Sequence, residues 1–387
     1  MKKYNFRKLI NDLHLWLGLA SGIILFIVCL TGTILAFETE LTLTLDREDH
    51  YSEENTNPIP FDRIIENLQK QDYCVKEFIF YGKSNRNYQF TVLTKEQVTQ
   101  SNGKPIRGKS IIINPYTGQQ VKAKGSFKVF MHTVEQLHRY LLLDPSIGRP
   151  IVGVSTIIFI FMCLSGLILW LPKKLKKFKI WNAWKQGFTL KTKANWKRIN
   201  YDVHNTFGFY ALFPLLLMGL TGLLWSFTWY YEGLEVVLGD KLGKSRFEKT
   251  IPLPDNQNSS VAAIDYTTLI KKTDSILPYS NFGTRIMLPS DPTQSVMIRK
   301  ISSDFLAYNA SDKLQFNPYT NELITKTLFK DYNFGAKIAG LIRGIHVGNF
   351  AGMLTKIIYF LCCLIATTLP ITGTLIWINK MKKSKGS

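Results

Sequence analysis

Four of the six histidines in this chain of 387 residues precede a hydroxyl–glycine pair, and the distances match in twos. They are His14, His138, His204 and His346. Two of them, His14 and His204, are followed at identical offsets by a glycine and then by a Thr-Gly pair. The other two precede a Ser-Gly or Thr-Gly pair by 27 and 26 residues. The glycines in register with the histidines are Gly18, Gly32, Gly166, Gly208, Gly222 and Gly373. Titratable rings beside apolar segments are costly and usually functional.

Two histidines that face each other across a helix bundle can hold a haem iron from both sides. Helical steps of three and four residues put His14 and Gly18 on one face, and the glycines leave that face without side chains. A flat macrocycle beside the helix needs this clearance, although glycine in membrane helices also serves close helix packing. We therefore pair His14 with His204 at an inner b-type haem and His138 with His346 at an outer one. Zinc and copper also accept imidazole, but the sequence places no third or fourth ligand nearby.

Four apolar stretches accompany these residues, and each is long enough to cross a hydrocarbon core about 30 Å thick. They are residues 15–37, 150–171, 207–227 and 353–378. The chain is 46% hydrophobic and carries a formal charge of +20, which excludes an ordinary soluble enzyme. The stretch from His14 to Thr31 is about 25 Å of helix, so the Thr-Gly pairs of spans one and three are expected at the depth of the outer histidines.

The positive charge marks one side of the membrane. Residues 173–198 contain many lysines and arginines and no acidic residue, and further cations precede span one and follow span four. In a chain that crosses four times these segments share one side, which the positive-inside rule makes cytoplasmic. Both termini are therefore expected in the cytoplasm. Nucleic-acid binding is not expected, because the cations flank spans.

Two polar stretches, between spans one and two and between spans three and four, fall on the outer side. Each has a helical pattern, at residues 61–70 and 265–277, followed by strand-like runs from residues 75 and 283 onward. Each also contains the turn sequence Asn-Pro-Tyr-Thr, followed by Gly118 or Asn321. The same turn at the same place in both stretches indicates an internal repeat, in which span one matches span three and span two matches span four.

The predicted fold class is membrane α-helical, with four transmembrane helices in a two-fold parallel repeat and two α+β modules on the outer side. Residues 144–150 are expected to break the helix before span two, so that His138 lies on a separate segment. The predicted segments are the N-terminus and first span (1–37), the first module (38–128), a helical segment with the second span (129–172), a basic loop (173–200), the third span (201–227), the second module (228–335), a helical segment with the fourth span (336–379) and the tail (380–387).

Other polar residues near the histidines follow a less specific pattern. Arg139 and Arg343 stand beside the outer histidines, where the topology rule does not explain cations, and are candidates to pair with haem carboxylates. Arg7 and Arg198 are interpreted as topology charges. His132 lies six residues before an outer ligand and is interpreted as a surface histidine, with a role as ligand or in facing a substrate as the alternatives.

The order of these motifs resembles the PepSY-associated transmembrane-helix family, which includes iron-regulated inner-membrane proteins and ferric-siderophore reductases. The resemblance rests on "LH..LG" and "LTG" of span one, on "LHR.LLL" and "SG..LW" around span two, and on the paired "NPYTG" turns. It covers nearly the whole chain. It implies a bacterial inner-membrane location, periplasmic PepSY-like modules, two b-type haems held by the four histidines, and electrons that pass from the cytoplasmic side to a periplasmic ferric complex.

Two features depart from the family pattern. Some members carry a fused flavin or NADPH-binding domain, whereas this sequence ends at Ser387 without a Gly-rich dinucleotide motif. A separate cytoplasmic or quinol donor is therefore expected. Ala36 stands where the other three spans carry a tryptophan near the hydroxyl–glycine pair.

The expected function is that of an oxidoreductase that reduces a ferric siderophore, or another periplasmic acceptor, from Fe(III) to Fe(II) and so releases iron. Haems with two histidine ligands have no open iron position, which favours electron transfer over oxygen activation. The alternative is a membrane-anchored PepSY binding or regulatory protein without redox activity, which leaves the four histidines unexplained. A transporter predicts polar residues near the midplane, where these spans are apolar. Arg285, Arg299 and Lys300 are interpreted as a solvated strand face.

Overall fold

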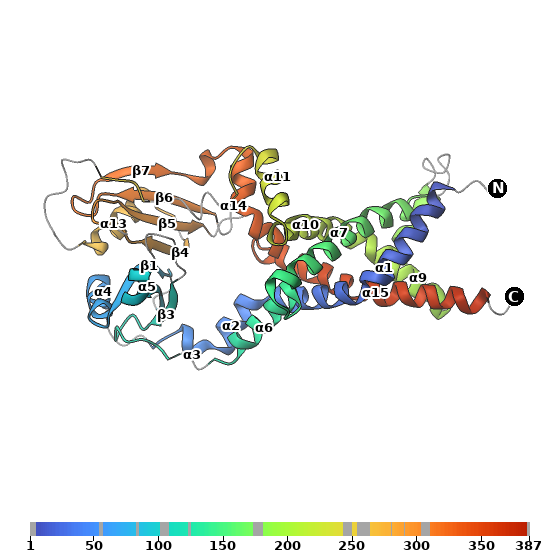
Figure 1. The fold of residues 1–387 in the computed structure, drawn as a ribbon, viewed down its shortest axis with the longest axis horizontal. Helices are drawn as coiled ribbons and strands as arrows, with labels where there is room; N and C mark the ends of the chain where they lie inside the picture. Colours follow the sequence, from blue (N-terminus) through green and yellow to red (C-terminus); the bar gives the residue numbers. More distant parts are fainter. Residues whose placement is uncertain are drawn as a thin grey trace. The chain divides into compact units, whose positions relative to one another are not determined.

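The computed structural model describes residues 5–53, 57–82, 85–100, 108–122, 125–172, 181–242, 250–253, 264–279, 281–289, 291–302 and 310–384. The chain divides into two compact units, which Figure 1 shows in sequence colours. The bundle unit comprises Met1–Glu38, Val129–Val237 and Ile342–Ser387. The sheet unit comprises Thr39–Lys128 and Leu238–Leu341, so the first ten residues of the predicted second module belong to the bundle unit instead. Residues 173–180 of the predicted basic loop lie outside the described residues.

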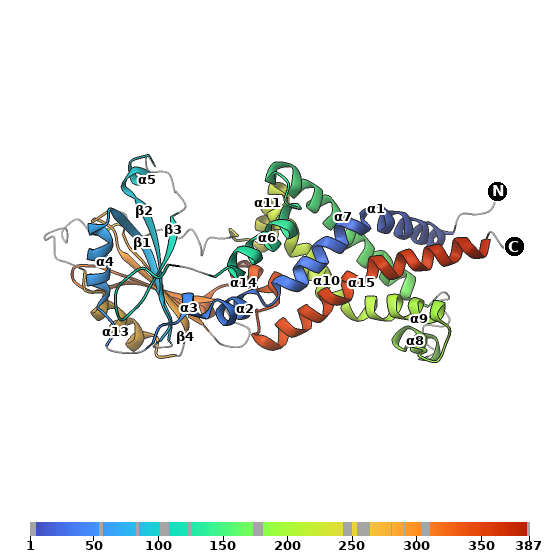
Figure 2. The ribbon, with the colours of Figure 1, turned by 90° about the horizontal axis from the view of Figure 1, so that it is seen from below.

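Four long helices form the bundle, and each is long and apolar enough to cross a membrane. They are α1 (Phe6–Leu35), α7 (Pro145–Trp170), the continuous run of α9 (Trp196–Asp202), η2 (Val203–Phe207), α10 (Gly208–Gly222) and η3 (Leu223–Trp225), and α15 (Met353–Ser384). Both α1 and α10 pack against α7 and α15, which closes the bundle. The start of α1 and the end of α15 lie at the same end of it (Figure 2), as four crossings require. Apolar side chains such as Ile23 and Phe213 are exposed on its outer surface, where lipid would cover them.

Shorter helices precede two of the spans and carry the outer histidines. They are α6 (Phe127–Tyr140) and α14 (Phe334–Val347). Leu141 and Leu142 take left-handed φ angles of 59° and 58°, which end α6, and Asp144 caps the start of α7. The predicted break before span two is therefore present, although Pro150 lies inside α7 rather than at the break.

The inner histidines lie inside their helices, about two turns from the first residue. The backbone around them differs between the two halves. His204 lies in the π-helical turn η2, whereas His14 lies in regular α-helix. A π turn inserts an extra residue into the helix and often marks a functional site. Equal sequence offsets therefore do not give equal backbone geometry.

The sheet unit contains one antiparallel sheet with the strand order β3-β2-β1-β4-β5-β6-β7. The strands are β1 (Tyr73–Phe80), β2 (Tyr88–Thr94), β3 (Lys109–Ile113), β4 (Asn281–Met287), β5 (Val296–Ser302), β6 (Ser311–Phe316) and β7 (Leu323–Thr327). The central pairing joins β1 to β4, with Phe78 opposite Ile286. The two predicted modules thus meet in one continuous sheet, a long-range pairing that no local sequence pattern specifies.

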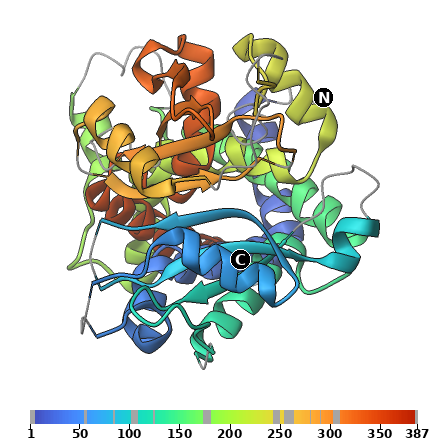
Figure 3. The same cartoon turned by 90° about the vertical axis from the view of Figure 1, so that its left-hand side faces the viewer.

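Two helices cover one face of this sheet, α4 (Phe61–Lys70) and α13 (Tyr266–Ile276), and Figure 3 shows them toward the viewer. Alternate residues of the strands point to this face and bury a shared core. Its fully buried side chains include Phe78, Ile286, Ile298 and Leu314 from the strands, and Ile64 and Leu269 from the helices. One core therefore joins residues from both polar stretches of the chain.

The predicted solvated face around Arg299 and Lys300 is wrong. Lys300 is 3% exposed and points toward α13, where its Nζ donates to Asp274 at 2.7 Å and to a backbone carbonyl at 2.6 Å. Arg299 points to the other face and is 8% exposed. Burial of a cation is costly, and the pairing with Asp274 offsets that cost for Lys300.

The repeated turn has the same conformation in both halves. The side-chain oxygens of Asn114 and Asn317 each accept a hydrogen bond from the backbone N–H two residues later, at 2.8 and 2.9 Å. Gly118 and Asn321 both take a positive φ, 67° and 56°, at the fifth position of the turn. The remaining described elements are α2 (Glu38–Leu45), α3 (Arg47–His50), α5 (Lys95–Gln100), α8 (Trp181–Phe188), α11 (Thr228–Leu238) and η5 (Phe329–Asp331).

Candidate haem-binding site

His14 of α1 and His204 of η2 face each other inside the bundle. Their ring centroids lie 6.5 Å apart and the ring planes are at 87°. Nδ1 of His14 lies 2.8 Å from the hydroxyl of Ser165 on α7, and Nδ1 of His204 lies 2.8 Å from the hydroxyl of Thr372 on α15. Each inner histidine is thus held by the hydroxyl of a Ser-Gly or Thr-Gly pair on another helix.

His138 of α6 and His346 of α14 repeat this arrangement at the outer pair, with ring centroids 6.4 Å apart and planes at 62°. Each Nδ1 has two oxygen partners on a spanning helix: Thr31 Oγ1 (3.1 Å) and Val28 O (2.9 Å) for His138, and Thr221 Oγ1 (3.0 Å) and Met218 O (3.1 Å) for His346. The hydroxyls again belong to Thr-Gly pairs. Thr31 lies on α1, which carries His14, and Thr221 lies on α10, which directly follows the turn η2 that carries His204.

These contacts decide which ring nitrogen carries the proton. All four hydroxyls lie 2.7–3.2 Å from a carbonyl three or four residues back in their own helix, to which they donate. The carbonyls of Val28 and Met218 can only accept, so Nδ1 of each outer histidine carries the proton. At the inner pair, the hydroxyl hydrogens have carbonyl acceptors of their own, which favours the same form. The Nε2 lone pair is then available for a metal ion, and the bond at Nδ1 orients the ring.

The ring spacing matches a metal held from two sides. An imidazole nitrogen binds a metal ion at about 2.1 Å and lies roughly 1.2 Å from its ring centroid, so two imidazoles on opposite sides of one metal have centroids about 6.5 Å apart. The observed spacings are 6.5 and 6.4 Å. In the part of the chain that the structure describes, no three His, Cys, Asp or Glu side chains form a metal site. Two histidines at this spacing suit a metal whose other ligands come from a macrocycle.

Burial favours the form of the outer histidines that binds metal. Burial, with a contribution from neighbouring His138, lowers the pKa of His346 to about 4. Burial likewise lowers the pKa of His138. Both rings are therefore neutral near pH 7, which is the form that can bind a metal through Nε2.

A glycine lies against each histidine ring. A Cβ atom added at these glycines would lie 3.2–3.5 Å from the Cε1 atom of a ring: Gly166 against His14, Gly373 against His204, Gly32 against His138 and Gly222 against His346. Each of these glycines therefore leaves room for the ring of a histidine on a different helix, and not for the histidine of its own span. Gly18 and Gly208 line the cavity around the inner pair, but an added Cβ there would meet Met162 and Leu369 and not a histidine.

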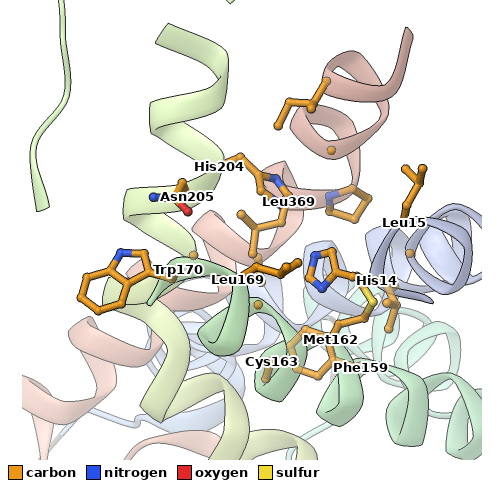
Figure 4. A pocket seen from close by; sticks show the side chains of 18 of the residues that line it. His14, Leu15, Phe159, Met162, Cys163, Leu169, Trp170, His204, Asn205 and Leu369 are labelled. Atoms are coloured by element: carbon orange, nitrogen blue, oxygen red, sulfur yellow. The ribbon is translucent and has the colours of Figure 1, made fainter. Parts of the chain in front are cut away.

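A cavity of about 300 Å³ surrounds the inner pair, which is at the lower end of the range for ligand pockets. Figure 4 shows His14 and His204 directed into it from different helices, among apolar side chains such as Met162, Phe159 and Leu369. Trp170 and Trp377 also line the cavity. At the outer pair, the ring of Trp225 lies 4.9 Å from that of His346. Aromatic and aliphatic walls of this kind suit a flat apolar ring.

The predicted arginine candidates differ in their surroundings. Arg139 forms an ion pair with Glu135 of its own helix at 3.0 Å. Arg343 interacts electrostatically with Glu38 and with His346, and Arg139 with His138. The side chain of His132 is 65% exposed and bonds within its own helix, so the structure does not bring it to the outer pair.

Several residues at the site have no distinctive sequence signal. The carbonyls of Val28 and Met218 hold the outer histidines, and any residue would provide them. Asn11, Tyr201, Asn205 and Lys380 line the inner cavity. The only available signal is spacing, because Asn11 and Tyr201 each stand three residues before an inner histidine.

A family model described as the PepSY-associated TM region matches residues 12–380. This chain belongs to that family. The match includes all four spans, both histidine pairs and the whole described sheet unit. A search of curated proteins gave no match.

Proposed function

We propose that this membrane protein is an electron conduit that binds two b-type haems and reduces a ferric chelate on the outer side. The observation that supports it most is the duplicated histidine pair, buried in a bundle of four candidate spans. Each pair has the ring spacing of a metal held from two sides and a protonated Nδ1 bound by oxygen. A membrane anchor needs none of these features.

When bound, b-type haem supplies a one-electron couple between Fe(III) and Fe(II). The residues of the chain fix the imidazoles through Nδ1, and the four Nε2 atoms would hold the haem irons. Two such ligands leave no position for oxygen, which favours simple electron transfer. Apolar side chains such as Phe159 and Leu369 line the inner cavity and would shield the faces of the bound ring from water.

The two sites are spaced to carry an electron across a membrane. His14 belongs to the inner site and Thr31 to the outer site, and both lie on α1. The stretch between them corresponds to about 25 Å of helix. This is close to the hydrocarbon thickness of about 30 Å, so one site lies toward each surface.

We also propose the direction of electron flow and the side of the membrane on which the chelate is reduced. Cations flank the spans at the end that carries the start of α1 and the end of α15, and the positive-inside rule makes that end cytoplasmic in a bacterial inner membrane. The sheet unit, with its repeated turns, is then periplasmic and reflects a two-fold parallel repeat. A cytoplasmic carrier or a quinol donates the electrons. A ferric siderophore is the preferred acceptor, because adding one electron to Fe(III) weakens its bonds to hard oxygen ligands and releases Fe(II).

The test is a reduced-minus-oxidised visible spectrum of the purified protein with its haem-to-protein ratio. We expect b-type bands and two haems per chain. Replacing His14 or His204 by alanine should remove the same haem, and replacing His138 or His346 should remove the other. His132→Ala is the matched control and should leave both. A haem-free protein from cells well supplied with haem would refute the proposal and favour a membrane-anchored binding or regulatory protein.

A further inference from the structure

The cavity around the inner histidines changes from polar to apolar along its helices. Toward the start of α1 and the end of α15 its lining includes the polar residues Asn11, Tyr201 and Lys380, together with Trp170 and Trp377. Asn205 and Thr374, which adjoin His204 and Gly373 in the chain, lie level with the histidines. Its apolar lining residues in the opposite direction are Leu25, Phe159, Leu215 and Ala366. The histidines lie between the two sets. The cavity is therefore built for a ligand with one polar edge and one apolar edge.

Exposure identifies the polar end as the mouth. Tyr201 is 46% exposed, and Asn11 and Lys380 are exposed as well. At the opposite end Leu215 is 3% exposed and Ala366 is 2% exposed, so that end is closed by packing. A ligand thus has its polar edge at the surface and its apolar edge inside the bundle.

The charge at the mouth of the cavity indicates which polar group of a ligand it would attract. Among the described residues that line the cavity, Lys380 is the single cation and none is acidic. Lys380 lies two turns beyond Gly373 on α15, hence on the face that contacts His204. A flexible ammonium group at this point attracts an anionic group of a ligand that lies against the histidines.

The arginines nearest the inner histidines have other partners. Arg7 donates to the carbonyls of Leu169 and Leu171 at the end of α7. Arg198 forms an ion pair with Asp202 of its own helix at 2.9 Å. Neither arginine is among the residues that line the cavity. This leaves the charge at the mouth to Lys380.

We infer that Lys380 pairs with a carboxylate of the inner haem, with Tyr201 and Asn11 as hydrogen-bonding neighbours at the same edge. The inference rests on the proposed function. Haem b carries two carboxylates on one edge and apolar groups on the opposite edge, which matches the gradient of the cavity. The carboxylates then point to the mouth, the direction we assign to the cytoplasm. An anionic lipid headgroup has similar chemistry and would compete for the same amine.

The test compares haemin with its dimethyl ester, which lacks both negative charges. The full chain is purified free of haem and titrated with each compound, and binding is followed by the haem absorption band. The titrations use a His346→Ala background, and are repeated in the unsubstituted chain, where the outer site contributes equally to every variant. We expect haemin to bind about two- to fivefold more tightly than the ester, as an exposed ion pair predicts.

The inference requires that Lys380→Gln bring this ratio close to one. Lys382→Gln is the matched control, because it removes the same charge two residues later on α15 and lies outside the cavity lining; it should keep the ratio. A ratio that survives in Lys380→Gln, or is absent without substitution, overturns the inference while leaving the proposed function intact. The same results are expected if the amine of Lys380 binds a lipid headgroup and not the haem. Failure of both compounds to bind overturns the proposed function itself.

Discussion

Replacing Ser165 by alanine tests whether the hydroxyl contacts orient the haem ligands. Ser165 is 1% exposed, and its Oγ lies 2.8 Å from Nδ1 of His14. Alanine removes this acceptor with little change in volume, and the buried N–H of the imidazole loses its partner. Such a loss costs about 1–3 kcal/mol. The same change at a residue that supports a metal ligand typically weakens metal binding by roughly 10–100-fold. We expect this weakening for the inner haem.

Thr221→Val provides a control of the same kind at the outer pair. Valine also removes a hydroxyl that accepts from a histidine, in this case His346. However, Nδ1 of His346 has a second acceptor, the carbonyl of Met218 at 3.1 Å. The ring therefore keeps an oxygen partner and its orientation. We expect the outer haem to be weakened less than tenfold.

The assay is the transfer of haem from each variant to an excess of apomyoglobin, with the amplitude of each phase giving the number of haems that leave. Ser165→Ala should produce one fast phase that carries half of the haem. Thr221→Val should change the rates only slightly. A Ser165→Ala protein that loses haem within twofold of the unsubstituted rate would contradict the role assigned to the hydroxyl. Equal effects of both substitutions would contradict the role assigned to the second acceptor.

Two further substitutions test the clearance beside a ring and a helix cap. A Cβ added at Gly373 would lie 3.2 Å from Cε1 of His204, so the rest of a leucine side chain would displace the ring. In Gly373→Leu the measured haem-to-protein ratio should therefore fall from two to one. Gly233→Ala, with no atom within 4 Å of its added Cβ, should keep two. In Asp265→Ala the cap of α13 is lost, which costs about 1 kcal/mol, so amide exchange in that helix should quicken roughly fivefold at neutral pH. Hydrogen bonds from the Thr268 hydroxyl and N–H lower the pKa of Asp265. The stabilisation of the helix by this carboxylate is therefore present above the ordinary carboxyl pKa and is lost as the pH falls through the lowered value. A difference in exchange rate between Asp265→Ala and the unsubstituted protein that persists in acid would contradict this.

Much of the bundle follows from local sequence, because helix geometry turns residue spacing into position. Four apolar stretches predict four spanning helices, and all four are present. Counting 1.5 Å per residue also places Thr31 at the depth of the outer histidines, where it contacts His138. The repeated Asn-Pro-Tyr-Thr turn forms as predicted at Asn114 and Asn317, since its hydrogen bonds lie within five residues. The spans, the depth of Thr31 along its helix and the turns each depend on neighbours in the chain, so the sequence alone determines them.

Other features depend on which helices and strands pack together, and the tertiary structure decided them. The pairing of β1 with β4 joins two stretches that the sequence presents as separate modules. The burial of Lys300 follows from the position of Asp274 on a helix that crosses the sheet. The polar mouth of the inner cavity combines Asn11, Tyr201 and Lys380 from three helices. Periodicity specifies which face of a helix is apolar, but contacts across helices depend on packing that residues distant in sequence determine together.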